Sequence, residues 1–300
     1  MNRKALLIFF GVTFCLAWIL FLIPLAFRES QGMLAQTVRL IAWSAAMWAP
    51  GVGAILATRY GLRQPLSVLN LRHLGERREY LWAWLLPPAL AVLSGLVALL
   101  VGWGKLDLEF ELIRQAMEGA PGGQSIPPWL IVVLQAVISL TLAPLVNTLL
   151  GLGEELGWRG FLLPQLLPLG QGRAILISGA VWGFWHAPAI LQGHNYPSHP
   201  FLGVFLMTIF CVLMGAIFSW LYLRTRSPWA PALAHGSLNA TAGLPLLFLR
   251  EVDITYGGTL LSLSGWLGIG LFVMWLVWSK RLPVLEPSRP SSPVGYDAAL

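Results

Sequence analysis

Charged residues are scarce in this sequence: they make up 11% of its 300 residues, whereas a soluble domain carries about a quarter. Hydrophobic residues make up 57%, and the mean hydropathy is +0.71. Uncharged runs of about 20 residues are long enough to cross a bilayer as helices. The composition therefore excludes an ordinary soluble domain and predicts an all-α, polytopic membrane protein.

Cysteine is also scarce, since the chain has only Cys15 and Cys211, and both lie in apolar runs. They offer neither the spacing of a metal site nor a disulfide framework, and we interpret them as packing residues. The sequence has no convincing internal repeat, which argues against a transporter built from duplicated halves.

Eight apolar runs are long enough to be membrane spans. The first is about 23 residues long, beyond the apolar core of a secretory signal, and no small-x-small cleavage site follows it, so it is predicted to be a retained anchor. The predicted spans are residues 5–27, 38–58, 81–103, 128–150, 174–192, 201–223, 229–249 and 258–279. We expect the fourth span to continue as helix into the charged stretch that follows it.

The basic residues predict the orientation of the chain. Eight spans place both termini on one side, and cytoplasmic termini put 14 of the 19 Lys and Arg residues inside, as the positive-inside rule favours. The net charge of +6 then indicates contact with anionic lipid and not with nucleic acid. We predict one membrane-embedded domain (residues 1–282) in the cell's inner membrane and a disordered cytoplasmic tail rich in Pro and Ser (283–300).

Acidic residues are nearly absent from the second half of the apolar region. Between Gly119 and Arg250 the sequence has only Glu154 and Glu155, in the stretch LGLGEELGWRGFLLP. Charges within a membrane are costly and usually functional. On a helix, Glu155 and Arg159 are four residues apart and can pair, whereas Glu154 faces about 100° away. A charged cap of the fourth span is the simpler interpretation of one such pair, but it does not explain the second glutamate.

Two further spans present polar groups. VWGFWHAPAI places Trp182 four residues before His186, and LAHGSLNAT places His235 and Asn239 on one helix face. Polar residues like these, taken one set at a time, more often serve in packing or in hydrogen bonds between helices than in catalysis. Three spans with such groups favour convergence on one buried site. Three other histidines are excluded because they lie in predicted loops: His73, His194 and His199.

These residue types suit the hydrolysis of an amide bond without a covalent intermediate. A carboxylate in a dry pocket, here Glu154, can act as a general base on water, and a neutral His186 would orient that water. His235 and Asn239 can donate hydrogen bonds to a developing oxyanion. Ser237 lies on a different helix face from His235, and its surroundings in the sequence are not those of an obvious catalytic nucleophile. The alternative is a zinc site of Glu154, His186 and His235, which is disfavoured because the spacing is not H-E-x-x-H and Asn239 is a poor zinc ligand.

The three stretches resemble the motifs of a known family. EELGWR resembles the EExxxR motif of the CAAX prenyl protease type 2 family, also called CPBP or Abi, and WGFWH and HGSLN resemble its second and third motifs, in the same order over about residues 145–245. The resemblance implies an eight-helix, glutamate-dependent intramembrane endopeptidase whose site opens toward the cytoplasm. It implies that Glu154 and His186 activate water, that His235 and Asn239 form the oxyanion hole, and that Glu155 and Arg159 tune Glu154, with Trp182 in support.

The implied substrate is a membrane-associated peptide or protein, which in some members of that family is a prenylated C-terminal motif. Two alternatives belong to other classes: a non-enzymatic membrane immunity or partner protein that retains the fold, and a proton-coupled transporter that uses Glu154. The intact set of four catalytic-type residues argues against the first. The lack of carboxylates in other spans argues against the second.

Overall fold

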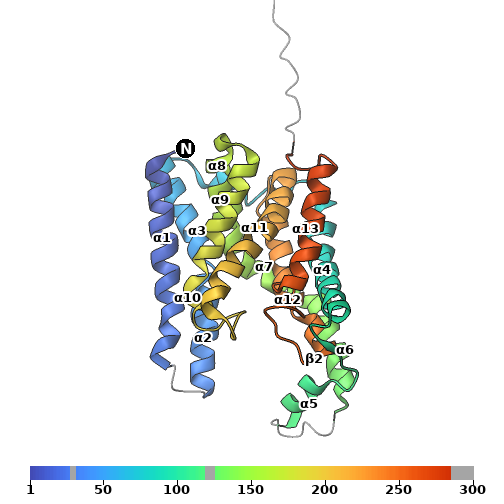
Figure 1. Ribbon diagram of the computed structural model, residues 1–300. Coiled ribbons are helices and arrows are strands. Elements are labelled where there is room, and N and C mark those ends of the chain that lie inside the picture. The colour runs from blue at the N-terminus through green and yellow to red at the C-terminus, as the bar shows by residue number, and fades with distance from the viewer. Residues whose placement is uncertain (28–31, 119–125, 285–300) are drawn as a thin grey trace, which may run out of the picture.

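The computed structural model describes residues 1–27, 32–118 and 126–284, which form a bundle of helices (Figure 1). The predicted all-α fold class is confirmed. The α-helices are α1 (Arg3–Leu22), α2 (Met33–Ala46), α3 (Ala49–Leu56), α4 (Glu79–Val101), α5 (Glu111–Glu118), α6 (Pro128–Leu140), α7 (Leu142–Glu155), α8 (Leu163–Leu166), α9 (Gln171–Trp185), α10 (Ala187–Ile190), α11 (Pro200–Thr225), α12 (Trp229–Thr241) and α13 (Leu263–Trp278).

Tighter and wider helical turns extend several of these helices. The 3₁₀-helices are Ile23–Phe27, Leu66–Leu69, Leu167–Leu169 and Leu244–Phe248, and the π-helices are Ala57–Leu62 and Leu156–Leu162. Two short strands, β1 (Lys105–Leu106) and β2 (Leu249–Arg250), pair antiparallel with Lys105 opposite Arg250.

A helix lies at each of the eight predicted spans, but fewer helices have the length and composition of a full span. Among the described residues four segments do: Arg3–Phe27, Met33–Leu62, Glu79–Val101 and Pro200–Thr225. A fifth is added if Pro128–Leu140 and Leu142–Leu169, which meet at 47°, count as one span. The continuation of helix beyond residue 150 is as predicted.

The remaining helices are shorter than their predicted spans because their ends are interrupted. Helix α9 ends at Trp185, three residues before Pro188, and α12 ends at Thr241, before the 3₁₀-helix that contains Pro245. Such breaks are tolerated at membrane depth where the backbone is buried in protein or lines a cavity. The prediction of full-length spans at residues 174–192, 229–249 and 258–279 is therefore corrected to three shorter helices.

The bundle has two distinct ends (Figure 1). We call one the terminal end. It gathers residues 57–78, 163–173, 224–229 and 279–284 together with the start of α1. The hydrogen bonds from Asn2 N to Gln165 Oε1 (3.4 Å), from Trp229 Nε1 to Leu71 O (2.9 Å) and from Gln171 Nε2 to Val284 O (2.7 Å) hold it together.

The other end, which we call the loop end, consists of residues 102–118, 191–199 and 243–262. Its segments are joined by the β1–β2 pairing and by hydrogen bonds from Tyr196 Oη to Leu261 O (2.8 Å) and from Gln192 Nε2 to Phe21 O (2.8 Å). The strands and α5 were not predicted, because two-residue strands carry almost no periodic signal and α5, although amphipathic, is only eight residues long. Most of the predicted disordered tail, residues 285–300, lies outside the described residues.

Candidate active site

The two adjacent glutamates lie where α7 ends and the π-helix Leu156–Leu162 begins. π-Helical turns are rare and often occur at functional sites. Glu155 and Arg159 are fully buried, and Glu154 is 2% exposed. Charged side chains this deep require partners, because an unpaired buried charge is strongly destabilising.

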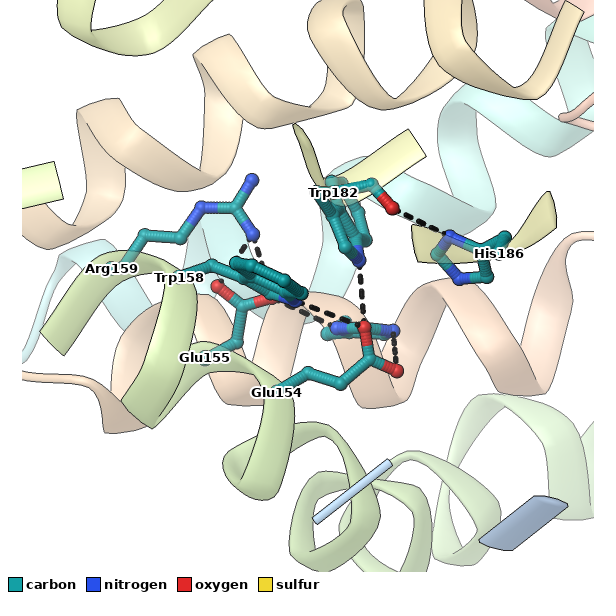
Figure 2. Close-up of polar contacts among 7 residues, drawn as sticks. Glu154, Glu155, Trp158, Arg159, Trp182 and His186 are labelled. Carbon is teal, nitrogen blue, oxygen red and sulfur yellow. Dashed lines mark hydrogen bonds and ion pairs between the residues drawn. The ribbon is translucent and has the colours of Figure 1, made fainter. Parts of the chain in front are cut away.

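Glu155 interacts with two basic side chains, those of Arg159 and His235. Arg159 Nη1 donates to both carboxylate oxygens of Glu155, at 2.9 Å each, so the predicted ion pair is present (Figure 2). His235 Nδ1 lies 2.9 Å from Glu155 Oε1. A carboxylate oxygen can only accept a hydrogen bond, so His235 Nδ1 carries the proton and donates it.

The guanidinium of Arg159 is also enclosed by aromatic rings. Its central carbon lies 4.5 Å from the ring centre of Trp182 and 5.2 Å from that of Phe218, which is fully buried. Cation–π contacts of this kind gain strength when water is excluded. They fix the direction of Arg159 and hence that of Glu155.

Glu154 is held differently, by one oxygen only. Its Oε2 accepts hydrogen bonds from Trp182 Nε1 at 2.6 Å and from Trp158 Nε1 at 3.4 Å. Its Oε1 accepts no hydrogen bond from the described residues and lies 3.9 Å from His235 Nε2, which is too far for one. One oxygen is thus anchored while the other is left for a further partner.

Trp182 connects Glu154 to His186. Its indole donates to Glu154, and its backbone carbonyl lies 2.9 Å from His186 Nδ1 (Figure 2). A carbonyl can only accept, so His186 Nδ1 is the protonated nitrogen and Nε2 of the neutral ring has a lone pair. The spacing of Trp182 and His186, one turn apart at the end of α9, makes this contact.

A cavity of about 510 Å³ brings the predicted residues together. Glu154, His186, His235 and Asn239 all line it, as does Trp182. Asn239 lies one turn beyond His235 on α12, is exposed to the cavity, and makes no hydrogen bond with the described residues. The convergence of three helices on one site, expected from the sequence, is therefore present in the structure.

The other polar candidates occupy different places. His199 contacts Asp253 at the loop end (3.9 Å), and His73 lies at the terminal end. His194 lines the same cavity as His186, which corrects the reason for its exclusion, because the loop 191–199 folds over the cavity and not away from it. Ser237 donates to Trp84 O at 2.6 Å and is fully buried, so its hydroxyl is already engaged.

The sequence analysis missed three residues around the site. Trp158 donates to Glu154 and lies four residues after it, so helical spacing could have identified it. Phe218 packs on Arg159 and His235 from α11, and Arg39 lines the cavity from α2. Nothing in the sequence links either of these two to the glutamates.

The alternative zinc set is not assembled in this arrangement. Among residues 1–27, 32–118 and 126–284, no three or more His, Cys, Asp and Glu side chains are placed to hold a metal ion. Trp182 and Trp158 occupy Glu154 Oε2, and His235 Nδ1 is committed to Glu155. The donor set in this arrangement therefore does not fit a zinc ion.

Comparison with known proteins finds a family model that matches part of the chain. Residues 126–241 match the family model described as Rce1-like, Type II CAAX prenyl endopeptidase Rce1-like. The match spans all three motifs and confirms the resemblance inferred from them. No curated protein matches the chain.

Proposed function

We propose that this chain, whose residues 126–241 match the type II CAAX prenyl endopeptidase family, is a glutamate-dependent intramembrane endopeptidase. The family supports a membrane protease in general terms. One observation supports the specific mechanism: Glu154 lines a cavity with His186, His235 and Asn239, and it is anchored there through Oε2 by two indole N–H groups, while its Oε1 accepts no hydrogen bond from the described residues.

Glu154 acts as the general base. Oε1 takes a proton from a water molecule as the water oxygen attacks the carbonyl carbon of the scissile amide. His186 positions the same water, because its Nδ1–H is donated to Trp182 O and its Nε2 lone pair is left to accept from the water. The fixed Trp182 bridge sets the relative position of base and water.

His235 and Asn239 stabilise the oxyanion that forms on the carbonyl oxygen. His235 already donates Nδ1–H to Glu155, so a donation from Nε2 requires the doubly protonated ring. Its positive charge, with that of Arg159, balances the two carboxylates, and the group of four is then neutral. The amide of Asn239 adds a neutral N–H donor from the next turn of α12.

Collapse of the tetrahedral intermediate completes the reaction. The C–N bond breaks as protonated Glu154 returns its proton to the leaving amine. The products are a carboxylic acid and an amine, Glu154 is again ionised, and no covalent enzyme intermediate is formed. Glu155 and Arg159 act as positioning residues, since they touch Glu154 and the substrate only through His235 and Trp182.

The substrate class follows from the family and the surroundings of the site. We propose a membrane-associated peptide or lipidated protein, of the kind that carries a CAAX-like C-terminal motif, in the cell's inner membrane. Cytoplasmic termini are supported by the 14 Lys and Arg residues on that side of the predicted topology.

The test compares peptide termini in membranes of cells that express the wild type, Glu154→Gln or Glu109→Gln. Glu109 is a matched control because it is an exposed acid at the loop end, paired only with Arg114 at 3.0 Å. We expect new termini with the wild type and Glu109→Gln and none with Glu154→Gln. Equal termini for all three proteins at equal expression would refute the assignment, and loss of activity on exhaustive chelation would favour the zinc alternative.

A further inference from the structure

One face of α2 forms a wall of the cavity that holds the catalytic residues. The side chains of α2 and of its C-terminal cap that line the cavity recur every three or four positions, which places them on the same side of a helix. They are Gln36, Arg39, Leu40, Trp43, Ser44 and Met47. The wall is therefore continuous over about three helical turns.

One end of this wall lies beside the catalytic glutamate. A Cβ atom at Gly153 would lie 2.7 Å from Met47 O and 2.8 Å from Trp48 Cα, so the backbone of α7 contacts the backbone at the end of α2. Gly153 immediately precedes Glu154 in the chain. Met47 therefore marks the position of Glu154 along the wall.

The other end of the wall has a positive charge. Among the described residues, Arg39 is the only Lys or Arg that lines this cavity or the second cavity, also of about 510 Å³, which shares Trp43, His194 and Asn195 with it. Burial and the neighbouring Arg39 lower the pKa of His194, so this histidine is neutral and adds no charge. The cation at this end is Arg39 alone.

The guanidinium of Arg39 is available to a ligand. Its central carbon lies 5.7 Å from the ring centre of Trp43, and the side chain is exposed. It makes no ion pair or hydrogen bond with residues 1–27, 32–118 or 126–284. Contact with a ring face leaves the guanidinium N–H groups at the edge free to donate, and their planar arrangement matches the two oxygens of a carboxylate.

The length of the wall corresponds to a short peptide. Arg39 lies eight residues before Met47, which is about 12 Å along the axis of a helix. An extended chain spans at most about 3.3–3.6 Å per residue, so three residues span about 10–11 Å. A carboxylate held by Arg39 would thus be about three residues from a peptide bond placed at Glu154.

The lining between the two ends is mostly apolar. Helix α12 follows the wall in the same direction, because His235 is beside Glu154 and Ala242 lines both cavities together with Arg39. The apolar side chains of this region are Leu40, Trp43, Leu238, Ala242 and Leu261. Such a lining suits apolar side chains on a peptide whose end is charged.

We propose that Arg39 binds the C-terminal carboxylate of the substrate and so places the bond that is cut about three residues before the end of the chain. Three residues also follow the cysteine in a CAAX motif. A chain that continues past Arg39 has a neutral carbonyl there and loses the ion pair. This inference rests on the proposed function and deepens it, but the carboxylate site can be tested without proteolysis.

The test measures protection of a cysteine on the wall in the purified full-length protein in detergent. Ser44→Cys is placed in a Cys15→Ser background, since Cys211 is buried. Position 44 lies between Arg39 and Met47, so a bound peptide covers it. The probes are acetylated Val-Ile-Leu as the free acid and as the C-terminal amide, and the reagent is the uncharged N-ethylmaleimide. We expect the acid to halve the labelling rate at about tenfold lower concentration than the amide.

Three variants assign this preference to Arg39. Arg39→Gln should make the acid and the amide equally effective, and Arg39→Lys, which keeps the charge, should retain part of the preference. Lys105→Gln, which removes a loop-end cation already paired with Glu251, should leave it unchanged. Equal protection by the two peptides before Arg39 is changed, or a preference that persists in Arg39→Gln, would overturn the proposal and leave Arg39 as a contact for lipid headgroups.

The position of the cut gives a separate outcome in the comparison of peptide termini. We expect the bond cut by the wild type to lie three residues before the end of its substrate. Termini at other distances from that end would retain the protease and overturn the role of Arg39. Protection by the acid with no new termini would retain the carboxylate site and reject proteolysis.

Discussion

At the scale of single residues, the site solves the problem of two adjacent carboxylates in an apolar environment. Glu155 accepts hydrogen bonds from the two basic side chains, Arg159 and His235, whereas Glu154 accepts hydrogen bonds only from neutral indole N–H groups. The two side chains are therefore chemically different although they are neighbours in sequence. This division leaves Glu154 as the carboxylate whose oxygen is free to react.

The hydrogen bond from Trp182 to Glu154 can be tested against a tryptophan without one. Trp220 is equally buried, and its Nε1 has no hydrogen-bond partner within the described residues. We expect Trp182→Phe to lower the free energy of unfolding by about 1.5–3 kcal/mol more than Trp220→Phe, because a hydrogen bond to a buried charge is lost. Thermal denaturation of the two variants in detergent measures the difference, and equal midpoints would contradict the role of this bond.

Asn239 is expected to act in the reaction and not in folding. Its amide has no partner among the described residues, so Asn239→Ala should leave the thermal midpoint unchanged. If the amide stabilises the oxyanion, kcat should fall by about 10²–10³-fold, which corresponds to a loss of about 2.7–4 kcal/mol of transition-state stabilisation. Cleavage rates at saturating substrate decide this, and an unaffected rate would assign Asn239 to the cavity wall alone.

At the scale of helices, close approach between α7 and α12 positions the carboxylates against His235. A Cβ atom at Gly236 would lie 2.5 Å from both Pro144 O and Thr148 N, which are backbone atoms of α7. Neither atom can move without shifting the helix. Gly236 therefore sets the distance between these two helices.

Gly243, seven residues further along the chain, provides a control for Gly236. Gly243 has φ −97°, and a Cβ atom there would meet nothing within 4 Å. We expect Gly236→Ala to destabilise the fold by about 1–3 kcal/mol, as overpacking does, and Gly243→Ala to have little effect. Thermal midpoints in detergent should separate the variants, and similar midpoints would mean that α12 can shift without cost.

Helix α4 explains why the hydroxyl of Ser237 is engaged in a hydrogen bond. Pro88 has no N–H, so the carbonyl of Trp84, four residues earlier, lacks its helical donor. Ser237 supplies one from α12 at 2.6 Å. In an apolar environment such a freed carbonyl must find another donor, and the serine has that structural task.

At the scale of the whole molecule, the orientation rests on the basic residues and is open to a direct test. We expect a green fluorescent protein fused after Leu300 to fluoresce and alkaline phosphatase at the same position to be inactive, because the positive-inside rule places the C-terminus in the cytoplasm. Phosphatase fused after Leu108, beyond α4, should be active. The opposite pattern would contradict the predicted orientation.

Much of the site was predictable because helical spacing is local. The i, i+4 relations of Glu155 with Arg159, of Trp182 with His186 and of His235 with Asn239 can be read along the chain, and the structure brings these sets together. Contacts between helices were not predictable in this way. Nothing in the local sequence indicates that Phe218 packs on Arg159, that Ser237 serves Trp84, or that Arg39 and His194 line the cavity.

The sequence by itself determined that this protein is a helical membrane protein, and it predicted which residues carry the chemistry and on which side the basic loops lie, because hydropathy, spacing and charge are properties of short stretches. Only the tertiary structure decided which oxygen of Glu154 is held by the indole N–H groups and which side chains from distant helices line the cavity. Both depend on how helices distant in sequence pack against one another. The three shorter helices follow from the same packing, since a helix enclosed by others need not satisfy the length that lipid would impose.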